Sequence, residues 1–149
     1  MVKRKALPRW LVFSSFLVYL LFLVYMLLFS ELMGRQLSGT ETGDTLSYNF
    51  VLFREIKRFW RYRQQLGFWA VFVNLAGNVL AFIPLGIYLP ALWKRCRHFL
   101  LMLVMAALFS VVIETLQLYY GVGSFDVDDI FLNTVGGGVG YLLYCVFRR

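Results

Sequence analysis

The fold is decided by the stretch FLLMLVMAALFSVVIETLQLYY, residues 99–120. Only one side chain in this stretch carries a formal charge, Glu114, and most of the others are apolar. A helix needs about 20 consecutive, mostly apolar residues to cross the hydrocarbon core of a bilayer. The stretch therefore predicts a membrane-spanning helix.

Further apolar runs of similar length lie on both sides of this stretch. A basic turn, residues 94–98, separates it from the run before it, and a short turn, residues 121–126, separates it from the run after it. A fourth run follows the basic N-terminal residues. This run is longer than the apolar region of a secretion signal, about 7–15 residues, and no small-residue cleavage site follows it, so we expect a retained anchor. The predicted spans cover residues 10–30, 68–92, 99–120 and 128–147.

The composition agrees with a membrane protein. Of the 149 residues, 60% are hydrophobic, whereas soluble domains are about 45–50% apolar. A chain of this length cannot bury so much apolar surface in its own core, so lipid must cover the rest. We predict an all-α, polytopic membrane protein in which a four-transmembrane-helix bundle forms one domain over residues 1–149.

The net charge of +7 comes from basic residues in short clusters at the ends of the apolar runs. Such clusters determine topology and contact lipid headgroups, and no basic stripe typical of a nucleic-acid-binding fold is present. With the N-terminus inside, nine Lys and Arg residues lie inside and six outside. The bias predicts that both termini face the cytoplasmic side of the membrane. Cys96 and Cys145 are isolated thiols that indicate neither a disulfide nor a metal site.

The segment after the first span predicts an amphipathic helix that lies on the membrane surface. Between residues 50 and 62, apolar Phe53, Ile56 and Trp60 recur at helical spacing, and basic side chains recur on the other side. The alternative is a solvated loop helix. We call the basic side chains the basic rim, and they are Arg54, Lys57, Arg58 and Arg61.

Polar side chains recur at helical spacing on three of the predicted spans. On the second span Asn78 follows Asn74 by four residues, and on the third Gln117 follows Glu114 by three. With a rise of about 1.5 Å per residue, these side chains and those around the start of the fourth span fall in the outer half of the membrane. The residues expected to form a site are Asn74, Asn78, Glu114, Gln117, Asp126, Asp129 and Asn133.

Each polar residue also has a structural interpretation. Asn, Gln and Ser often hold membrane helices together, at about 0.6 kcal/mol each, whereas an acidic residue at a helix centre costs about 2.5–3.5 kcal/mol and marks a functional candidate. Glu114 is therefore the strongest candidate. Gly136 and Gly140 predict close helix packing. A hard cation held by the three acidic site residues is a minor alternative, and we expect no metal or cofactor.

Three segments resemble the signatures of the VanZ-like family of membrane proteins. They read NLAGNVLAFIPLG at residues 74–86, SVVIETLQ at 110–117 and DVDDIFLNTVGG at 126–137. The segment Asn49-Phe-Val-Leu-Phe53 is similar to one that follows the first span in many members, so the core of the resemblance covers residues 49–145. Many members carry an arginine shortly before the first aspartate of the third signature, where this chain has Val122-Gly-Ser124. No role for that arginine is carried over.

The resemblance implies a function in the bacterial cell envelope. The family is named for a protein associated with low-level resistance to teicoplanin, a lipoglycopeptide antibiotic. The first hypothesis is that the polar residues and the basic rim bind a lipid headgroup, a cell-wall precursor or a lipoglycopeptide. The partners expected are thus membrane lipids and lipid-linked molecules of this kind.

The second hypothesis is a membrane-embedded enzyme. Glu114 would act as general acid or base, and Asp126 or Asp129 would be its partner, in transfer or hydrolysis on a lipid-linked substrate. No Ser, Cys or His stands beside a base as a nucleophile, which weakens this hypothesis. A proton relay through Glu114 is weaker still, because the inner half of the spans lacks a continuing polar chain.

Overall fold

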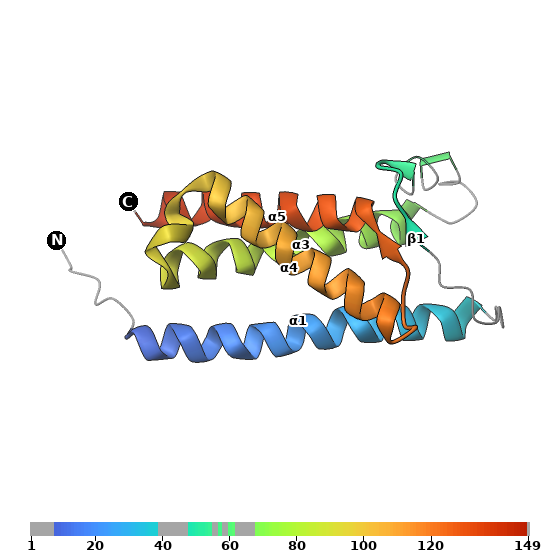
Figure 1. Ribbon diagram of the computed structural model, residues 1–149, viewed down its shortest axis with the longest axis horizontal. Helices are drawn as coiled ribbons and strands as arrows, with labels where there is room; N and C mark the ends of the chain where they lie inside the picture. Colours follow the sequence, from blue (N-terminus) through green and yellow to red (C-terminus); the bar gives the residue numbers. More distant parts are fainter. Residues whose placement is uncertain (1–7, 39–47, 55–56, 58–59, 62–67, 149) are drawn as a thin grey trace.

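Four long helices dominate the part of the chain that the computed structural model describes (Figure 1). It describes residues 8–38, 48–54, 57, 60–61 and 68–148, with the backbone alone for 27–38 and 68–74. Each long helix has the length and apolar composition needed to cross a membrane. The predicted all-α fold with four spans is confirmed. The helices are α1 (Arg9–Ser38), α3 (Phe68–Leu92), α4 (Phe99–Tyr119) and α5 (Val127–Phe147).

The bounds of α3, α4 and α5 lie within one residue of the prediction, but α1 is longer than predicted. It ends at Ser38, whereas the apolar run predicted an end at residue 30. The added turns contain Glu31, Arg35 and Gln36, which are good helix formers although they are polar. The helix therefore continues past the point where its apolar run stops.

The backbones of α3 and α5 are in direct contact along a line of glycines. A Cβ atom added at Gly136 would lie 2.1 Å from the carbonyl oxygen of Val79, and one added at Gly140 would lie 2.0 Å from that of Ile83. Gly86 on α3 approaches α5 equally closely. The predicted packing role of Gly136 and Gly140 is confirmed, since any side chain at these positions would force the two helices apart.

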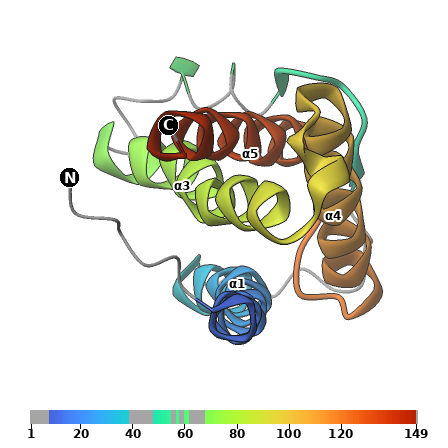
Figure 2. The same cartoon turned by 90° about the vertical axis from the view of Figure 1, so that its left-hand side faces the viewer.

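The other two helices pack around this pair less closely. α4 crosses it obliquely, with Met102 and Ala106 buried against Gly137. α1 stands apart from the other three in the end-on view (Figure 2). It is held by ring contacts to α3 and by the Tyr19 hydroxyl, which donates a 2.7 Å hydrogen bond to the carbonyl of Ala81.

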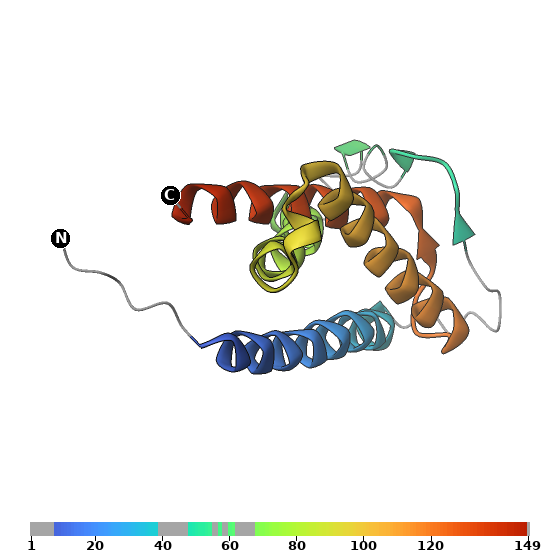
Figure 3. The same ribbon diagram turned by 60° about the vertical axis from the view of Figure 1, so that its left-hand side comes forward.

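The two ends of the bundle differ in structure. The start of α1, the 3-10 helix η1 (Lys94–Arg97) and the end of α5 lie at one end, which we call the basic end (Figure 1). At the opposite end, strand β1 (Tyr48–Asn49) pairs in parallel with β2 (Phe125–Asp126), with Asn49 beside Asp126 (Figure 3). We call this the polar end.

The strand pair was not predicted. We expected a turn over residues 121–126 and a helix from Phe50, but Tyr48–Asn49 is extended and the following helical backbone begins at Arg54. The turn itself exists: Gly121 has a positive φ of 62°, and the amides of Val122 and Gly123 close the end of α4 on the carbonyl of Gln117. Two-residue strands carry no periodic pattern, so only their tertiary pairing reveals them.

Candidate functional site

Asp126 is the centre of the hydrogen bonds at the polar end. Its side chain caps the N-terminus of α5, where Oδ1 accepts a 2.8 Å hydrogen bond from the amide of Asp128. The same oxygen accepts a 3.1 Å hydrogen bond from Nδ2 of Asn49. The backbone amide of Asp126 donates to Oε2 of Glu114 at 3.0 Å. One residue thus joins α4, α5 and the strand β1.

Glu114 lies in the last turns of α4 and is 3% exposed. A carboxylate that faced lipid would be costly, and this one faces the protein, where it accepts the amide hydrogen of Asp126. Gln117, one turn further along α4, is buried as well. Glu114 therefore faces the bundle interior, and its hydrogen bond to the amide of Asp126 joins α4 to the start of α5.

A second set of hydrogen bonds and ring contacts holds the turn between β1 and the basic rim. Phe53 has a φ of 65°, a left-handed conformation that a bulky side chain rarely adopts. Its amide donates to Oδ1 of Asp128, and its ring packs edge-on against Phe131 at 5.3 Å between centroids. Oδ1 of Asn49 accepts the amide of Val51 at 3.1 Å. These contacts hold a backbone conformation that alone costs about 1–3 kcal/mol.

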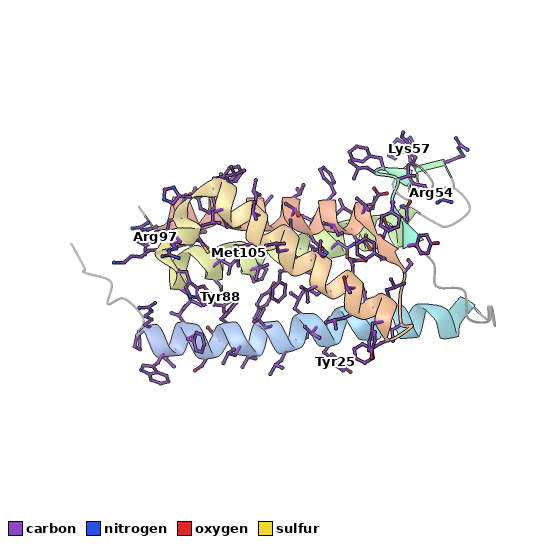
Figure 4. The ribbon with its side chains drawn as sticks, in the orientation of Figure 1. Tyr25, Arg54, Lys57, Tyr88, Arg97 and Met105 are labelled. Atoms are coloured by element: carbon purple, nitrogen blue, oxygen red, sulfur yellow. The ribbon has the colours of Figure 1, made fainter. Side chains whose placement is uncertain are left out.

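The basic rim starts directly after this turn. The described residues Arg54, Lys57 and Arg61 have helical backbone and exposed side chains, and the amide of Lys57 donates to the carbonyl of Phe53 at 3.0 Å. Arg54 and Lys57 lie at the polar end, above the start of α5 (Figure 4). Arg58 lies outside the described residues. The helical backbone agrees with the predicted helix, and its location on a membrane surface stays a prediction.

Two further polar contacts cross between helices. Nδ2 of Asn78 on α3 donates to Oδ1 of Asp129 on α5. Nδ2 of Asn133 on α5 donates to Oγ of Ser110 on α4 at 2.9 Å. Asn133 is 1% exposed, and its Oδ1 has no hydrogen-bond partner within the described part of the chain. These pairs match the helix-joining role that amides often have in membranes.

Five of the seven expected site residues thus fall into three hydrogen-bonded groups at the polar end and just below it. Glu114 contacts Asp126, Asn78 contacts Asp129, and Asn133 contacts Ser110. Asn74 lies in α3, but its side chain is outside the described ones. The role of these residues as a ligand site stays a prediction.

The expected site residues did not include Asn49, Asp128 and Ser110, which the structure brings into these groups. All three lie in segments that resemble the family signatures, which was the available signal. Their partners are 77, 75 and 23 residues away in the chain, so spacing alone could not pair them.

Neither acid–base catalysis nor metal binding gains support from this geometry. Glu114 and Asp126 use carboxylate oxygens to accept backbone and amide hydrogens, which is how a protein fastens its own segments. Among the described residues, no group of three or more His, Cys, Asp or Glu side chains is placed to hold a metal ion. The arrangement suits a rigid structural support beneath an exposed cationic surface.

A model of the VanZ/LLP1 family matches residues 16–148. The chain belongs to the VanZ/LLP1 family. It is similar to Protein VanZ of Enterococcus faecium, with 34% identity over 73 residues, and the match covers 49% of this chain and 45% of that protein. This chain therefore matches less than half the length of that relative. No solved structure matches the chain.

Proposed function

We propose that the polar end binds the anionic headgroup of a lipid-anchored envelope molecule: a lipid headgroup, a cell-wall precursor or a lipoglycopeptide. The basic rim makes the contacts, and the buried polar residues hold it in place. Lys and Arg suit this role because they donate charge-assisted hydrogen bonds to phosphate and carboxylate groups. Through such binding the protein contributes to glycopeptide resistance, the function for which its family is named.

One observation carries this proposal: the exposed cationic segment is held by hydrogen bonds to buried acidic residues at the start of α5. Asn49 joins the segment to Asp126, and the amide of Phe53 joins it to Asp128. Trp60 in the same segment is 67% exposed, which suits the interfacial region of a bilayer. The segment therefore combines preorganised cations with a side chain that suits the headgroup level.

The proposal places the polar end on the outer face of the plasma membrane, with both termini in the cytoplasm. The Lys and Arg bias supports this orientation, because nine basic residues precede, follow or connect the spans on the side of the termini. Envelope precursors and glycopeptides then reach the basic rim from outside the cell. The catalytic alternative has weaker support, because Glu114 and Asp126 are engaged in fastening.

The test measures binding to the full-length protein in phosphatidylcholine nanodiscs. The probes are teicoplanin and, separately, a polyprenyl diphosphate. A basic residue near a charged headgroup contributes about 1 kcal/mol, so the variant R54Q/K57Q/R61Q should bind the recognised probe roughly 100-fold more weakly. The charge-keeping variant R54K/K57R/R61K should stay within about threefold of the parent protein.

A separate variant tests the hydrogen bond that joins Asn49 to Asp126. Asn49→Ala removes the hydrogen bond to Asp126 but no charge, so binding should weaken while the four helices stay folded, as measured by circular dichroism. Equal binding by the parent protein and the triple Gln variant for both probes would overturn the proposal.

A further inference from the structure

The two ends of the bundle differ in charge as well as in structure. No acidic residue occurs within residues 1–30, 56–113 or 130–149. The start of α1, η1 and the end of α5, which meet at the basic end, lie within these ranges. All eight acidic residues lie within 31–55 and 114–129. The basic end thus carries positive charge that no acidic side chain of its own segments offsets.

Two arginines at this end bind the protein itself. Nη2 of Arg9 donates to the carbonyl of Leu92 at 3.0 Å, and Nε of Arg97 donates to that of Pro90 at 3.2 Å. These carbonyls belong to the last turn of α3, where helix carbonyls lack intrahelical partners and the helix dipole is negative. The Tyr141 hydroxyl on α5 donates to the carbonyl of Arg97 at 2.6 Å. These hydrogen bonds join four elements at the basic end: α1, α3, η1 and α5.

Lys94 and Arg95 lie in η1 together with Arg97, and both side chains are exposed. Trp93 is 41% exposed and Trp10 is 67% exposed, each directly beside a basic residue in sequence. Indole side chains favour the headgroup level of a bilayer. Lys94 and Arg95 are therefore placed at the depth of lipid phosphates.

We propose that the basic end binds the phosphate of an anionic phospholipid, with Lys94 and Arg95 as the binding side chains and Trp93 beside the top of its acyl chains. A phospholipid with a choline or ethanolamine group presents a cation as well as a phosphate. The segments of the basic end have no acidic residue to pair with that cation, so this end favours an anionic headgroup. This site lies at the opposite end from the basic rim and does not depend on the function proposed for it.

The test locates lipid contacts by crosslinking. The full-length protein is placed in phosphatidylcholine nanodiscs that contain phosphatidylglycerol with a photoreactive group near the top of one acyl chain. Crosslinks to residues 93–98 are measured by peptide mass spectrometry, and the same probe built on phosphatidylcholine serves as the comparison. We expect phosphatidylglycerol to crosslink these residues several-fold more than phosphatidylcholine.

Matched variants test whether Lys94 and Arg95 themselves bind the lipid. K94Q/R95Q should lower the apparent affinity at residues 93–98 roughly 25-fold, about fivefold for each charge. K94R/R95K and the polar-end control K57Q/R61Q should leave it unchanged. Arg9 and Arg97 are kept because they hold α3. Equal crosslinking of the two lipids would overturn the proposal, and so would an equal loss of affinity in K57Q/R61Q. Displacement of phosphatidylglycerol by millimolar inorganic phosphate would overturn it as well, because it would indicate a site for free phosphate.

Discussion

Buried polar residues in this protein differ in how well their hydrogen bonds are satisfied. Asp126 makes three of the contacts at the polar end. Asn133 lies deeper between α4 and α5, where its Nδ2 donates to Ser110 and its Oδ1 finds no partner among the described residues. A buried donor that loses its acceptor costs more than a pair that is replaced as a whole. The two members of the Ser110–Asn133 pair should therefore respond unequally to substitution.

Ser110→Ala should destabilise the protein by about 1 kcal/mol, because it leaves Nδ2 of Asn133 buried without its acceptor. Asn133→Leu should be neutral or slightly stabilising, because it removes the unpaired oxygen while the Ser110 hydroxyl can bond the carbonyl one turn earlier in its own helix. Reversible unfolding in mixed micelles measures both changes. A larger loss in Asn133→Leu than in Ser110→Ala would contradict this assignment.

At the scale of elements, the contact between α3 and α5 sets the architecture. Gly86, Gly136 and Gly140 let the two backbones meet, and α4 then crosses the pair. Gly77 is also on α3, and apart from its chain neighbours and the adjacent backbone of α3 no atom of the described residues lies within 4 Å of the position where a Cβ would be built. The chain therefore offers a matched control on one of the same helices.

Gly136→Ala should destabilise the protein by about 1–3 kcal/mol or more, because its Cβ would lie 2.1 Å from the carbonyl oxygen of Val79 and the backbone there cannot yield easily. Gly77→Ala should stabilise it by about 0.5–1 kcal/mol, because alanine restricts the unfolded chain and its Cβ meets no other segment among the described residues. Thermal unfolding in detergent compares the two. Similar melting temperatures for both variants would rule out close packing at Gly136.

At the scale of the whole molecule, the protein has two chemically different ends. The basic end is made of arginines that hold α3 and of exposed Lys94 and Arg95. The polar end is made of buried carboxylates and amides under an exposed basic rim. Each of the four long helices in the described part of the chain can cross the membrane, which puts the two ends of the bundle on opposite faces and the start of α1 and the end of α5 on the same face.

Cysteine labelling tests which face is which. In the background Cys96→Ser/Cys145→Ser, Lys57→Cys should react with a membrane-impermeant maleimide in intact cells, and Lys94→Cys should react only after permeabilisation. Both positions are exposed, so access to the reagent decides the outcome. The reverse pattern would place the termini outside and would remove the route by which envelope molecules reach the basic rim.

The sequence by itself determined the number of spans, most of their bounds and the use of Gly136 and Gly140 for packing. These features are local, because about 20 apolar residues must form a helix in lipid and glycines four residues apart share one face of a helix. The cost of a carboxylate in lipid accounts for the burial of Glu114 that the structure shows.

Only the tertiary structure decided how the polar residues pair. Asn49 meets Asp126 and the amide of Phe53 meets Asp128 because helix packing brings segments more than 70 residues apart to one end of the bundle. It also decided that Asp126 joins several segments by hydrogen bonds and that the helical backbone after β1 begins at Arg54 and not at Phe50. Spacing along one helix predicts which side chains share a face, but hydrogen bonds between elements depend on how those faces meet, and a single sequence carries no periodic signal for that.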